Sequence, residues 1–546
     1  MDFRSNALQK INAVPANLAF ALFLGSFFLL SGCRHADPVK NFILITLDTQ
    51  RADHVGAYPG SRASTPCIDS LAAEGVLFEN GFSPIPITLP AHAAMLFSQP
   101  PHKMKVYNNH QRITPDESRP SLASVFRDRG FETAAFVSLG TLQEGTGIGE
   151  GFDHFDDRFP EGQWYLPAEE VNRRVFPWLE QHDKEPFFLW VHYSDPHEPY
   201  SPPSDPEDLT IMLNDRMLEE TRLNMNVERE IPLNLDKGKN RIRFVVDNPI
   251  KKNRGGFLAK FFTLEFAPGS EAEGLTVTRS EGWSDPAKTG DLLCRDEAFI
   301  VIDNLGPPRE VVMTYRGILI LGDAGIKSQY KQEVEYMDGE IGRLIDRLKE
   351  RDLFDKTYIL LVGDHGEGLG EYSGPKGQLH FGHIHYLYNS YTRVPYIYYD
   401  PESKHKGAVD TRFVSLLDIA PTVMSVMGFK KRSFHEGENF LAVGRIPERS
   451  LFQETYRPEA FQEKFAILRF PRHLILTPES GAYELFDLRT DPEERENLYR
   501  EQELSSEIRE LKRELDARAI RILKNKIEVQ PDKASEEMLK ALGYIK

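Results

Sequence analysis

Acidic and histidine side chains follow two short apolar runs of this sequence, at positions where they could bind a metal ion. Residues 41–46 (NFILIT) lead to Asp48, and residues 357–362 (TYILLV) lead to Asp364 and His365. Apolar, β-branched runs of this length are typical of parallel strands that are buried on both faces. Carboxylate oxygens and an imidazole nitrogen form a mixed ligand set for one divalent cation. We therefore interpret these three residues as candidate metal ligands.

Thr88 offers a hydroxyl group that could act as a nucleophile. Pro90 and a helix-forming run follow it, which predicts that the hydroxyl lies at a helix N-terminus. Unpaired backbone N–H groups and the positive end of the helix dipole favour an anion there and help a hydroxyl to ionise. Taken alone, Thr88 is as easily interpreted as a plain helix N-cap. Beside a divalent cation, it would be both a ligand and a nucleophile, because a metal-bound hydroxyl is acidified.

Alternating strands and helices are expected to bring these residues together. A third apolar run, residues 186–192 (PFFLWVH), also ends in polar residues, and residues 334–348 carry apolar side chains at spacings of three and four. The first pattern is typical of a buried strand and the second of an amphipathic helix. Together they predict an α/β fold with a doubly wound, mostly parallel sheet. Ligands of such sheets bind beyond the carboxyl ends of the strands, where the polar residues lie.

The residue pattern changes in the middle of the chain, which predicts further domains. Residues 206–325 contain short β-like runs punctuated by Gly, Pro and Asn, which predicts an inserted all-β module of the sandwich type. This module could bind a glycan or a lipid headgroup, or it could be a structural lid. The predicted parts are a signal peptide at 1–32, a tether at 33–40, a catalytic α/β domain at 41–205 and 326–430, the β-rich module at 206–325, and a C-terminal α+β subdomain at 431–546.

The N-terminal residues have the pattern of an export signal. Arg4 and Lys10 precede an apolar run at residues 18–30, which as a helix would reach about 20 Å and fall short of the ~30 Å bilayer core. The tetrapeptide LSGC that ends at Cys33 resembles a bacterial lipobox, whose cysteine is lipidated. We expect an exported protein held by acyl chains on a cell-envelope membrane, the outer membrane if one is present. An ordinary signal peptide or an uncleaved anchor is the alternative.

The charge of the chain argues against one class of partner. The 66 basic and 83 acidic residues give a net charge of −17. A field of that sign repels phosphate backbones over most of the surface, so we expect no nucleic-acid partner. The three cysteines are too few for a disulfide framework.

Several ordered segments resemble the sulfatase family of the alkaline-phosphatase superfamily. The resemblance covers about residues 41–205 and 326–546 and skips the insertion. It implies an alkaline-phosphatase-like fold, ester cleavage at a divalent metal ion, and further site residues in matching segments. These segments are Leu47–Asp53, Thr88–His92, Pro101–Lys103, His192–His197, Val362–Gly370 and Gly382–His383.

Two departures from the family pattern bear on the chemistry. Sulfatases make a formylglycine from Cys or Ser within C/S-x-P-x-R, whereas this chain has Thr88 and His92 at the corresponding places. Calcium-binding sulfatases usually carry a second Asp where this chain has Thr49. The reduced ligand set is similar to that of relatives that cleave or transfer phosphoesters through a threonine, using manganese or zinc. We expect one divalent ion (Mn, Zn or Ca) and a phosphate- or sulfate-ester substrate of the envelope lipid or glycan class.

The resemblance also implies roles for the histidines. Thr88 would attack phosphorus, His92, His102 and His197 would neutralise the equatorial oxygens, and His383 would protonate the leaving alkoxide. Two further hypotheses stay open: a sulfatase that works without formylglycine, and a non-catalytic lipoprotein that binds glycans. A second metal on Asp195, His197 and His383 is less favoured, because two-zinc nucleotide phosphodiesterases space their Asp and His by three residues and this chain separates them by one.

Overall fold

The structure is a computed structural model, and its description is confined to part of the chain. It describes residues 41–114, 116–160, 163–198, 200, 209–221, 223, 228–246, 259–267, 274–283, 291–293, 297–319, 323–373, 379–402, 405–442, 449–456 and 462–526. The signal peptide predicted at 1–32, the tether at 33–40 and the lipidation site Cys33 lie outside these ranges. Among the helices within these ranges, none has both the length and the hydropathy to cross a bilayer.

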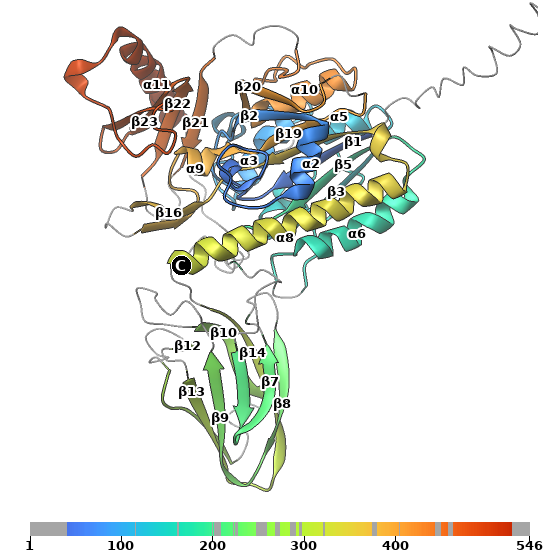
Figure 1. Cartoon of the computed structure of the whole chain (residues 1–546), viewed down its shortest axis with the longest axis vertical. Helices are drawn as coiled ribbons and strands as arrows, with labels where there is room; N and C mark the ends of the chain where they lie inside the picture. The colour runs from blue at the N-terminus through green and yellow to red at the C-terminus, as the bar shows by residue number, and fades with distance from the viewer. Residues whose placement is uncertain are drawn as a thin grey trace, which may run out of the picture. The chain divides into compact units, whose positions relative to one another are not determined.

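A mostly parallel sheet forms the centre of the fold (Figure 1). The strand order is β18-β2-β19-β15-β1-β5-β3-β4, with β20 paired to β2. Parallel pairs join β15, β1, β5, β3 and β4, whereas β19 runs antiparallel to both of its neighbours. The strands are β1 (Asn41–Leu47), β2 (Val76–Phe82), β3 (Glu132–Phe136), β4 (His154–Asp156), β5 (Phe187–Tyr193), β15 (Thr357–Gly363), β18 (Arg393–Val394), β19 (Tyr396–Tyr399) and β20 (Ala408–Ser415).

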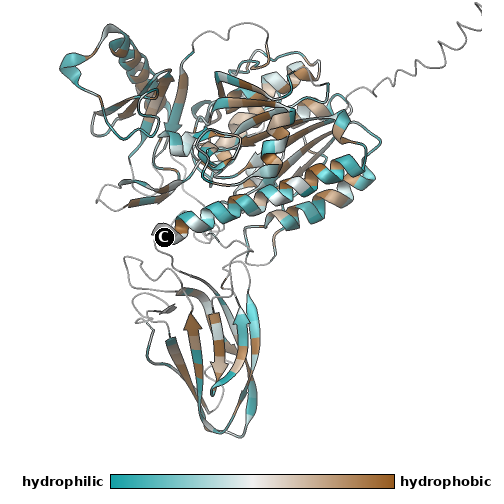
Figure 2. Cartoon of the chain, viewed as in Figure 1, coloured by the Kyte–Doolittle hydropathy of each residue, from teal (hydrophilic) through white to brown (hydrophobic). Residues whose placement is uncertain are grey.

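Helices cover both faces of this sheet because successive side chains of its strands point to opposite sides. Phe42 and Leu44 pack into the core beneath one group of helices, and Ile43 and Ile45 into the core beneath the other. The central strands β1 and β5 are buried along their whole length and mostly hydrophobic (Figure 2), as expected for strands covered on both faces. The first group is α3 (Thr88–Phe97), α5 (Leu122–Arg127) and α10 (Ile419–Val426), and the second is α2 (Pro66–Glu74), α6 (Ala168–Gln181) and α8 (Asp323–Glu350).

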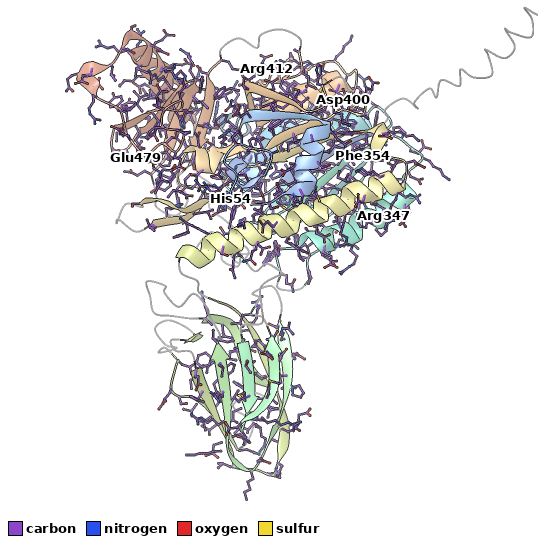
Figure 3. The ribbon with its side chains drawn as sticks, viewed as in Figure 1. His54, Arg347, Phe354, Asp400, Arg412 and Glu479 are labelled. Carbon is purple, nitrogen blue, oxygen red and sulfur yellow. The ribbon has the colours of Figure 1, made fainter. Side chains whose placement is uncertain are left out.

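The long helix α8 has the amphipathic face that its spacing predicts. Met337, Ile341 and Leu344 are fully buried against the sheet. Arg347, labelled in Figure 3, places its guanidinium carbon 5.0 Å from the ring centre of Phe176 on the neighbouring helix α6. This cation–π contact and the apolar face fix α6 and α8 side by side on the same face of the sheet.

The insertion consists of two antiparallel sheets with a core of their own. Inward residues such as Ile242, Phe244, Ile300 and Met313 form one hydrophobic cluster, and alternate residues of β13 are buried, as expected for a sandwich. The strand orders are β12-β10-β14-β8 and β11-β13-β9-β6-β7. Their bounds are β6 (Leu209–Leu213), β7 (Arg216–Thr221), β8 (Arg229–Leu235), β9 (Gly238–Val246), β10 (Ala259–Ala267), β11 (Leu275–Arg279), β12 (Asp291–Leu293), β13 (Glu297–Asn304) and β14 (Arg309–Leu319).

The C-terminal part pairs a four-stranded antiparallel sheet with one helix. Leu511 and Leu515 of α11 are fully buried, and the helix packs on β22 and β23. The predicted fold class, with its extra antiparallel sheets, is confirmed, whereas the exact domain boundaries stay predictions. The remaining elements are β21 (Leu451–Thr455), β22 (Lys464–Arg469), β23 (Arg472–Thr477), β24 (Ala482–Asp487), α11 (Ser506–Asn525), the hairpin β16 (Gly368–Ser373) and β17 (Leu379–Gly382), and the short helices α4 (Pro101–Met104) and α9 (Asn389–Thr392).

Candidate active site and metal centre

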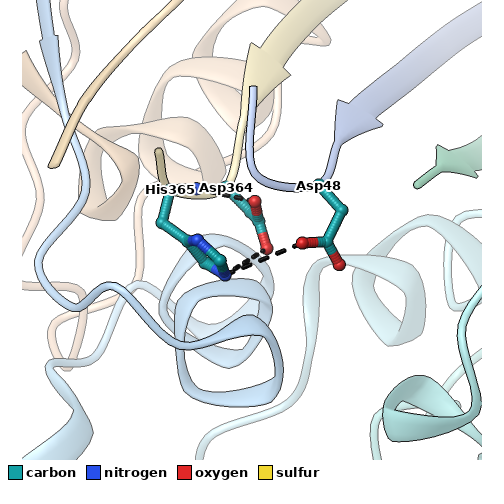
Figure 4. Close-up of side chains that lie close together, drawn as sticks. All are labelled: Asp48, Asp364 and His365. Carbon is teal, nitrogen blue, oxygen red and sulfur yellow. Dashed lines mark hydrogen bonds and ion pairs between the residues drawn. The ribbon is translucent and has the colours of Figure 1, made fainter. Parts of the chain in front are cut away.

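The carboxyl ends of β1 and β15 bring the predicted metal ligands together (Figure 4). The strands pair in a register that sets Leu47 opposite Gly363, so the residues that follow them are neighbours. Nε2 of His365 lies 3.7 Å from Oδ1 of Asp48 and 3.4 Å from Oδ2 of Asp364. One ligand atom from each of the three residues lies within 4.8 Å of the others. The sheet thus places two carboxylates and an imidazole around one point.

The chemistry of this cluster fits a divalent cation. Asp48, Asp364 and His365 are fully buried, and Oδ2 of Asp364 accepts no hydrogen bond from the described residues. Burial raises the pKa of Asp48 and of Asp364, and the nearby Asp48 carboxylate raises the pKa of Asp364 further, while burial lowers the pKa of His365. Buried oxygens without donors are costly unless a cation pairs with them. A neutral imidazole is the form that ligates a metal.

Thr49 does not add a ligand of the kind that a second Asp would supply. Its backbone lies in the left-handed region, at φ 55°. Its N–H donates to Oδ1 of Asp364 at 3.1 Å, and its hydroxyl donates to the carbonyl of Pro196 at 2.6 Å. The turn after β1 therefore presents one carboxylate to the centre and uses Thr49 to fix the neighbouring loops.

Thr88 lies beside the cluster as the first residue of α3. The N-cap is Ile87, which makes no side-chain cap, so the plain N-cap interpretation of Thr88 is wrong. The Thr88 hydroxyl lies 3.4 Å from Nε2 of His365 and is fully buried. The hydroxyl thus meets both the metal cluster and the positive end of the helix dipole.

His92 contacts the backbone of Thr88 and the side chain of Thr46 on strand β1. Its Nδ1 donates to the Thr88 carbonyl at 2.8 Å, and its Nε2 lies 3.1 Å from the Thr46 hydroxyl. That hydroxyl in turn accepts a hydrogen bond from Nε1 of Trp190 at 2.8 Å, so its proton is directed at His92. Burial, with His192 nearby, lowers the pKa of His92 well below its usual value. Both ring nitrogens of His92 are thus engaged with Thr88 and Thr46, an arrangement suited to holding Thr88 in place, and the action of His92 on substrate oxygens stays a prediction.

His197 and His383 join the centre from two other segments. The rings of His197 and His383 lie 5.2 Å apart, and the ring of His383 lies 4.5 Å from that of His365. Nδ1 of His383 pairs with Oε2 of the buried Glu367 at 3.0 Å. Burial lowers the pKa of His197 to about 4 and that of His383 to about 3. The ring of His383 is thus oriented by Glu367, a residue that the sequence reasoning did not single out.

Asp195 and His102 make their contacts elsewhere. Oδ1 of Asp195 accepts hydrogen bonds from the Tyr165 hydroxyl at 3.1 Å and the Ala168 N–H at 2.9 Å. Within the described ranges, the cluster of Asp48, Asp364 and His365 is the single metal-capable group.

His102 donates its backbone N–H to Glu454 on β21 at 2.9 Å, and its ring Nδ1 pairs with the same carboxylate at 2.9 Å. The contacts of His102 thus lead to the C-terminal sheet and not to the cluster.

Asn109 is a second residue that the sequence reasoning missed. Its Oδ1 accepts a hydrogen bond from the N–H of Leu89, the residue after Thr88, at 2.9 Å. Because a backbone N–H can only donate, this bond fixes the orientation of the amide. Nδ2 of Asn109 is buried and meets no acceptor among the described residues. A buried side-chain donor near the start of α3 thus has no acceptor among the described residues, and no sequence motif marks it.

Comparison with known proteins defines the class. The sulfatase family model matches residues 40–429, and the model for the C-terminal part of N-sulphoglucosamine sulphohydrolase matches residues 378–521. The chain therefore belongs to the sulfatase family, and it is a hydrolase that acts on esters. Members of this family usually bind a divalent metal ion, and the cluster of Asp48, Asp364 and His365 is a possible site in this chain.

Individual relatives span both sulfate and phosphonate chemistry. The uncharacterized sulfatase YidJ of Escherichia coli is 23% identical, with 84% of this chain and 82% of the relative covered. The N-acetylglucosamine-6-O-sulfatase of Bacteroides thetaiotaomicron is 22% identical, with 93% and 91% covered. The structure of a phosphonate monoester hydrolase of Agrobacterium radiobacter matches with a TM-score of 0.56 at 17% identity, covering 89% of this chain and 96% of that one. The structural match supports the alkaline-phosphatase-like fold.

Proposed function

We propose that this protein is a metal-dependent phosphoester hydrolase or transferase that uses Thr88 as its nucleophile. One observation carries the proposal: the Thr88 hydroxyl lies 3.4 Å from Nε2 of His365, beside the buried cluster of Asp48, Asp364 and His365. A hydroxyl held there is suited to attack an ester of phosphorus. A threonine cannot form the aldehyde of formylglycine, on which sulfatases of this family rely.

The residues of the centre have separate roles in metal binding and in nucleophilic attack. Asp48, Asp364, His365 and Thr88 would hold the cation, which when bound supplies positive charge and acidifies the hydroxyl beside it. The Thr88 hydroxyl gives up its proton to solvent, its oxygen forms a bond to phosphorus, and the bond from phosphorus to the leaving oxygen breaks. Water or an acceptor alcohol then attacks the phosphothreonine and releases Thr88 by the reverse path.

The developing charge needs donors, and the site contains them. Nδ2 of Asn109 has no acceptor among the described residues, and we assign it to a non-bridging oxygen of the ester. His197 is assigned to a second such oxygen because its ring lies against His383 within the centre. His383, oriented by Glu367, protonates the leaving alkoxide. An anionic ester beside this ring favours the imidazolium form that the step requires.

The cellular setting is part of the proposal. The lipobox-like LSGC ending at Cys33 supports export and lipid anchoring to a bacterial cell-envelope membrane. The substrate class we favour is a phosphoester of an envelope lipid or glycan. The net charge of −17 continues to disfavour nucleic acid.

A sulfate ester is the second candidate substrate, and the family match favours it. The matched family models and the N-acetylglucosamine-6-O-sulfatase relative are named for sulfate ester or sulfamate cleavage. The two candidates differ in what Thr88 must do, since only the phosphoester reaction has a direct use for an unmodified threonine.

A substrate panel with a matched variant tests the proposal. Purified residues 34–546 would be assayed with Mn²⁺, Zn²⁺, Ca²⁺ or EDTA on bis-p-nitrophenyl phosphate, p-nitrophenyl phenylphosphonate, p-nitrophenyl phosphate and p-nitrophenyl sulfate. We expect metal-dependent cleavage of a phosphorus ester, lost in Thr88→Ala and partly kept in Thr88→Ser. Sulfate cleavage alone, or equal activity in Thr88→Ala and the unmodified chain, would overturn it. No detectable cleavage of any of the four substrates, together with no bound metal, would favour a glycan-binding lipoprotein.

A further inference from the structure

His192 is a buried histidine beside the metal cluster to which the reaction above gives no role. It lies near the end of β5, and the register sets it opposite Thr46 of β1. The ring is fully buried, and its Nε2 lies 3.5 Å from Oδ2 of Asp48. The ring therefore adjoins the carboxylate oxygen that lies away from His365, which approaches Oδ1 instead.

The protonation of this ring is fixed by its other neighbour. The backbone N–H of Ser138 donates to Nδ1 of His192 at 3.3 Å, and the Ser138 hydroxyl lies 2.9 Å from the same nitrogen. A backbone N–H can only donate, so Nδ1 is an acceptor. A neutral ring that accepts at Nδ1 carries its one proton on Nε2. The Ser138 hydroxyl is further held by Ser194 at 2.7 Å.

The proton on Nε2 determines whether the His192 ring can ligate the metal or can only donate a proton contact to Asp48. A nitrogen that carries a proton has no lone pair for a metal, so His192 is not a further ligand. Its Nε2–H instead faces Oδ2 of Asp48 at 3.5 Å. Ligating carboxylates are commonly oriented by such outer donors, which affect metal affinity.

We propose that His192 is a positioning residue that orients the Asp48 carboxylate for the cation, through an Nε2–H whose tautomer Ser138 enforces. This inference rests on the metal dependence in the proposed function. It predicts that loss of the ring N–H weakens metal binding while the fold is kept, and that an amide N–H at the same place restores binding.

The test compares two variants by metal affinity rather than by turnover. Residues 34–546 stripped with EDTA would be titrated with Zn²⁺ or Mn²⁺ by calorimetry, and unfolding would be followed by circular dichroism. We expect His192→Leu to bind about 10–100-fold more weakly. His192→Gln, which keeps an N–H donor near the position of Nε2, should stay within about threefold of the unmodified chain.

Spectra of the Co²⁺-loaded proteins separate the two roles of the ring. If His192 is a positioning residue, His192→Gln keeps the visible band shape and intensity of the unmodified protein. A changed spectrum would show that the ring is a ligand and would overturn the proposal, as would equal affinities in His192→Leu and the unmodified chain. If the unmodified chain bound no divalent ion at all, the metal dependence of the proposed function would itself fail, which is a different result.

Discussion

Replacing Asn109 tests whether the start of α3 stabilises a developing anion. The side chain does two things: Oδ1 accepts the Leu89 N–H at 2.9 Å, and Nδ2 remains available. Asn109→Ala removes both, so the Leu89 N–H loses a buried acceptor, at a cost of about 1–3 kcal/mol in stability. Loss of one preorganised donor to an oxyanion costs about 100–1,000-fold in kcat, or about 2.7–4 kcal/mol in the barrier.

A second variant separates the structural contribution of Asn109 from its catalytic one. Asn109→Asp keeps an oxygen for the Leu89 N–H but has no N–H to donate, and as an anion it also repels the ester. We expect near-normal urea unfolding for Asn109→Asp with a loss of activity at least as large as that of Asn109→Ala. The assay is kcat and KM on the best substrate of the panel. Activity within threefold of the unmodified chain in Asn109→Ala would refute the assignment of Nδ2 to the ester.

Three further perturbations test the surroundings of the site. His92→Ala should lower the free energy of unfolding in urea by about 2–4 kcal/mol, since it removes a buried ring and the partner of the Thr46 hydroxyl; a change below about 0.5 kcal/mol would contradict this. Burial raises the pKa of Asp195 to about 7, so this carboxyl binds its proton more tightly in the folded state and its contribution to stability falls as pH rises from about 4 to about 7. Asp195→Asn should therefore gain stability relative to the unmodified chain between pH 5 and pH 7.5, and an unchanged difference would refute the assignment. Saturation of the cluster with Zn²⁺ or Mn²⁺ at about 100 times Kd should stabilise the fold by about 2.7 kcal/mol, reversibly with EDTA; an unchanged Tm with Mn²⁺, Zn²⁺ and Ca²⁺ alike would argue against the metal centre.

The sequence predicted the central sheet and the metal cluster because both depend on local patterns. The apolar runs that precede Asp48 and Asp364 have the pattern of strands buried on both faces, and both form such strands. Parallel strands end at one edge, so their following residues had to meet there. The side chains of the cluster then follow from strand register, which a hydrophobic pattern specifies well.

The roles of the outer residues could not be predicted in this way. His92 and His102 were assigned from their place in motifs, whereas their contacts depend on Thr46 of a distant strand and Glu454 of the C-terminal sheet. Asn109 lies in a loop without a motif, and its function follows from one hydrogen bond to Leu89. Such pairings are set by tertiary packing, which neither periodicity nor residue type reveals.

The central claim is that Thr88 forms a covalent bond to the substrate's phosphorus. The most direct measurement is to mix the metal-loaded protein with p-nitrophenyl phenylphosphonate, quench it in acid within milliseconds to seconds, and map the adduct by peptide mass spectrometry. We predict a phenylphosphonyl group on Thr88 that accumulates with the burst of p-nitrophenol and is absent from Thr88→Ala. Turnover of this substrate without any adduct on Thr88, or with equal rate in Thr88→Ala, would contradict the mechanism.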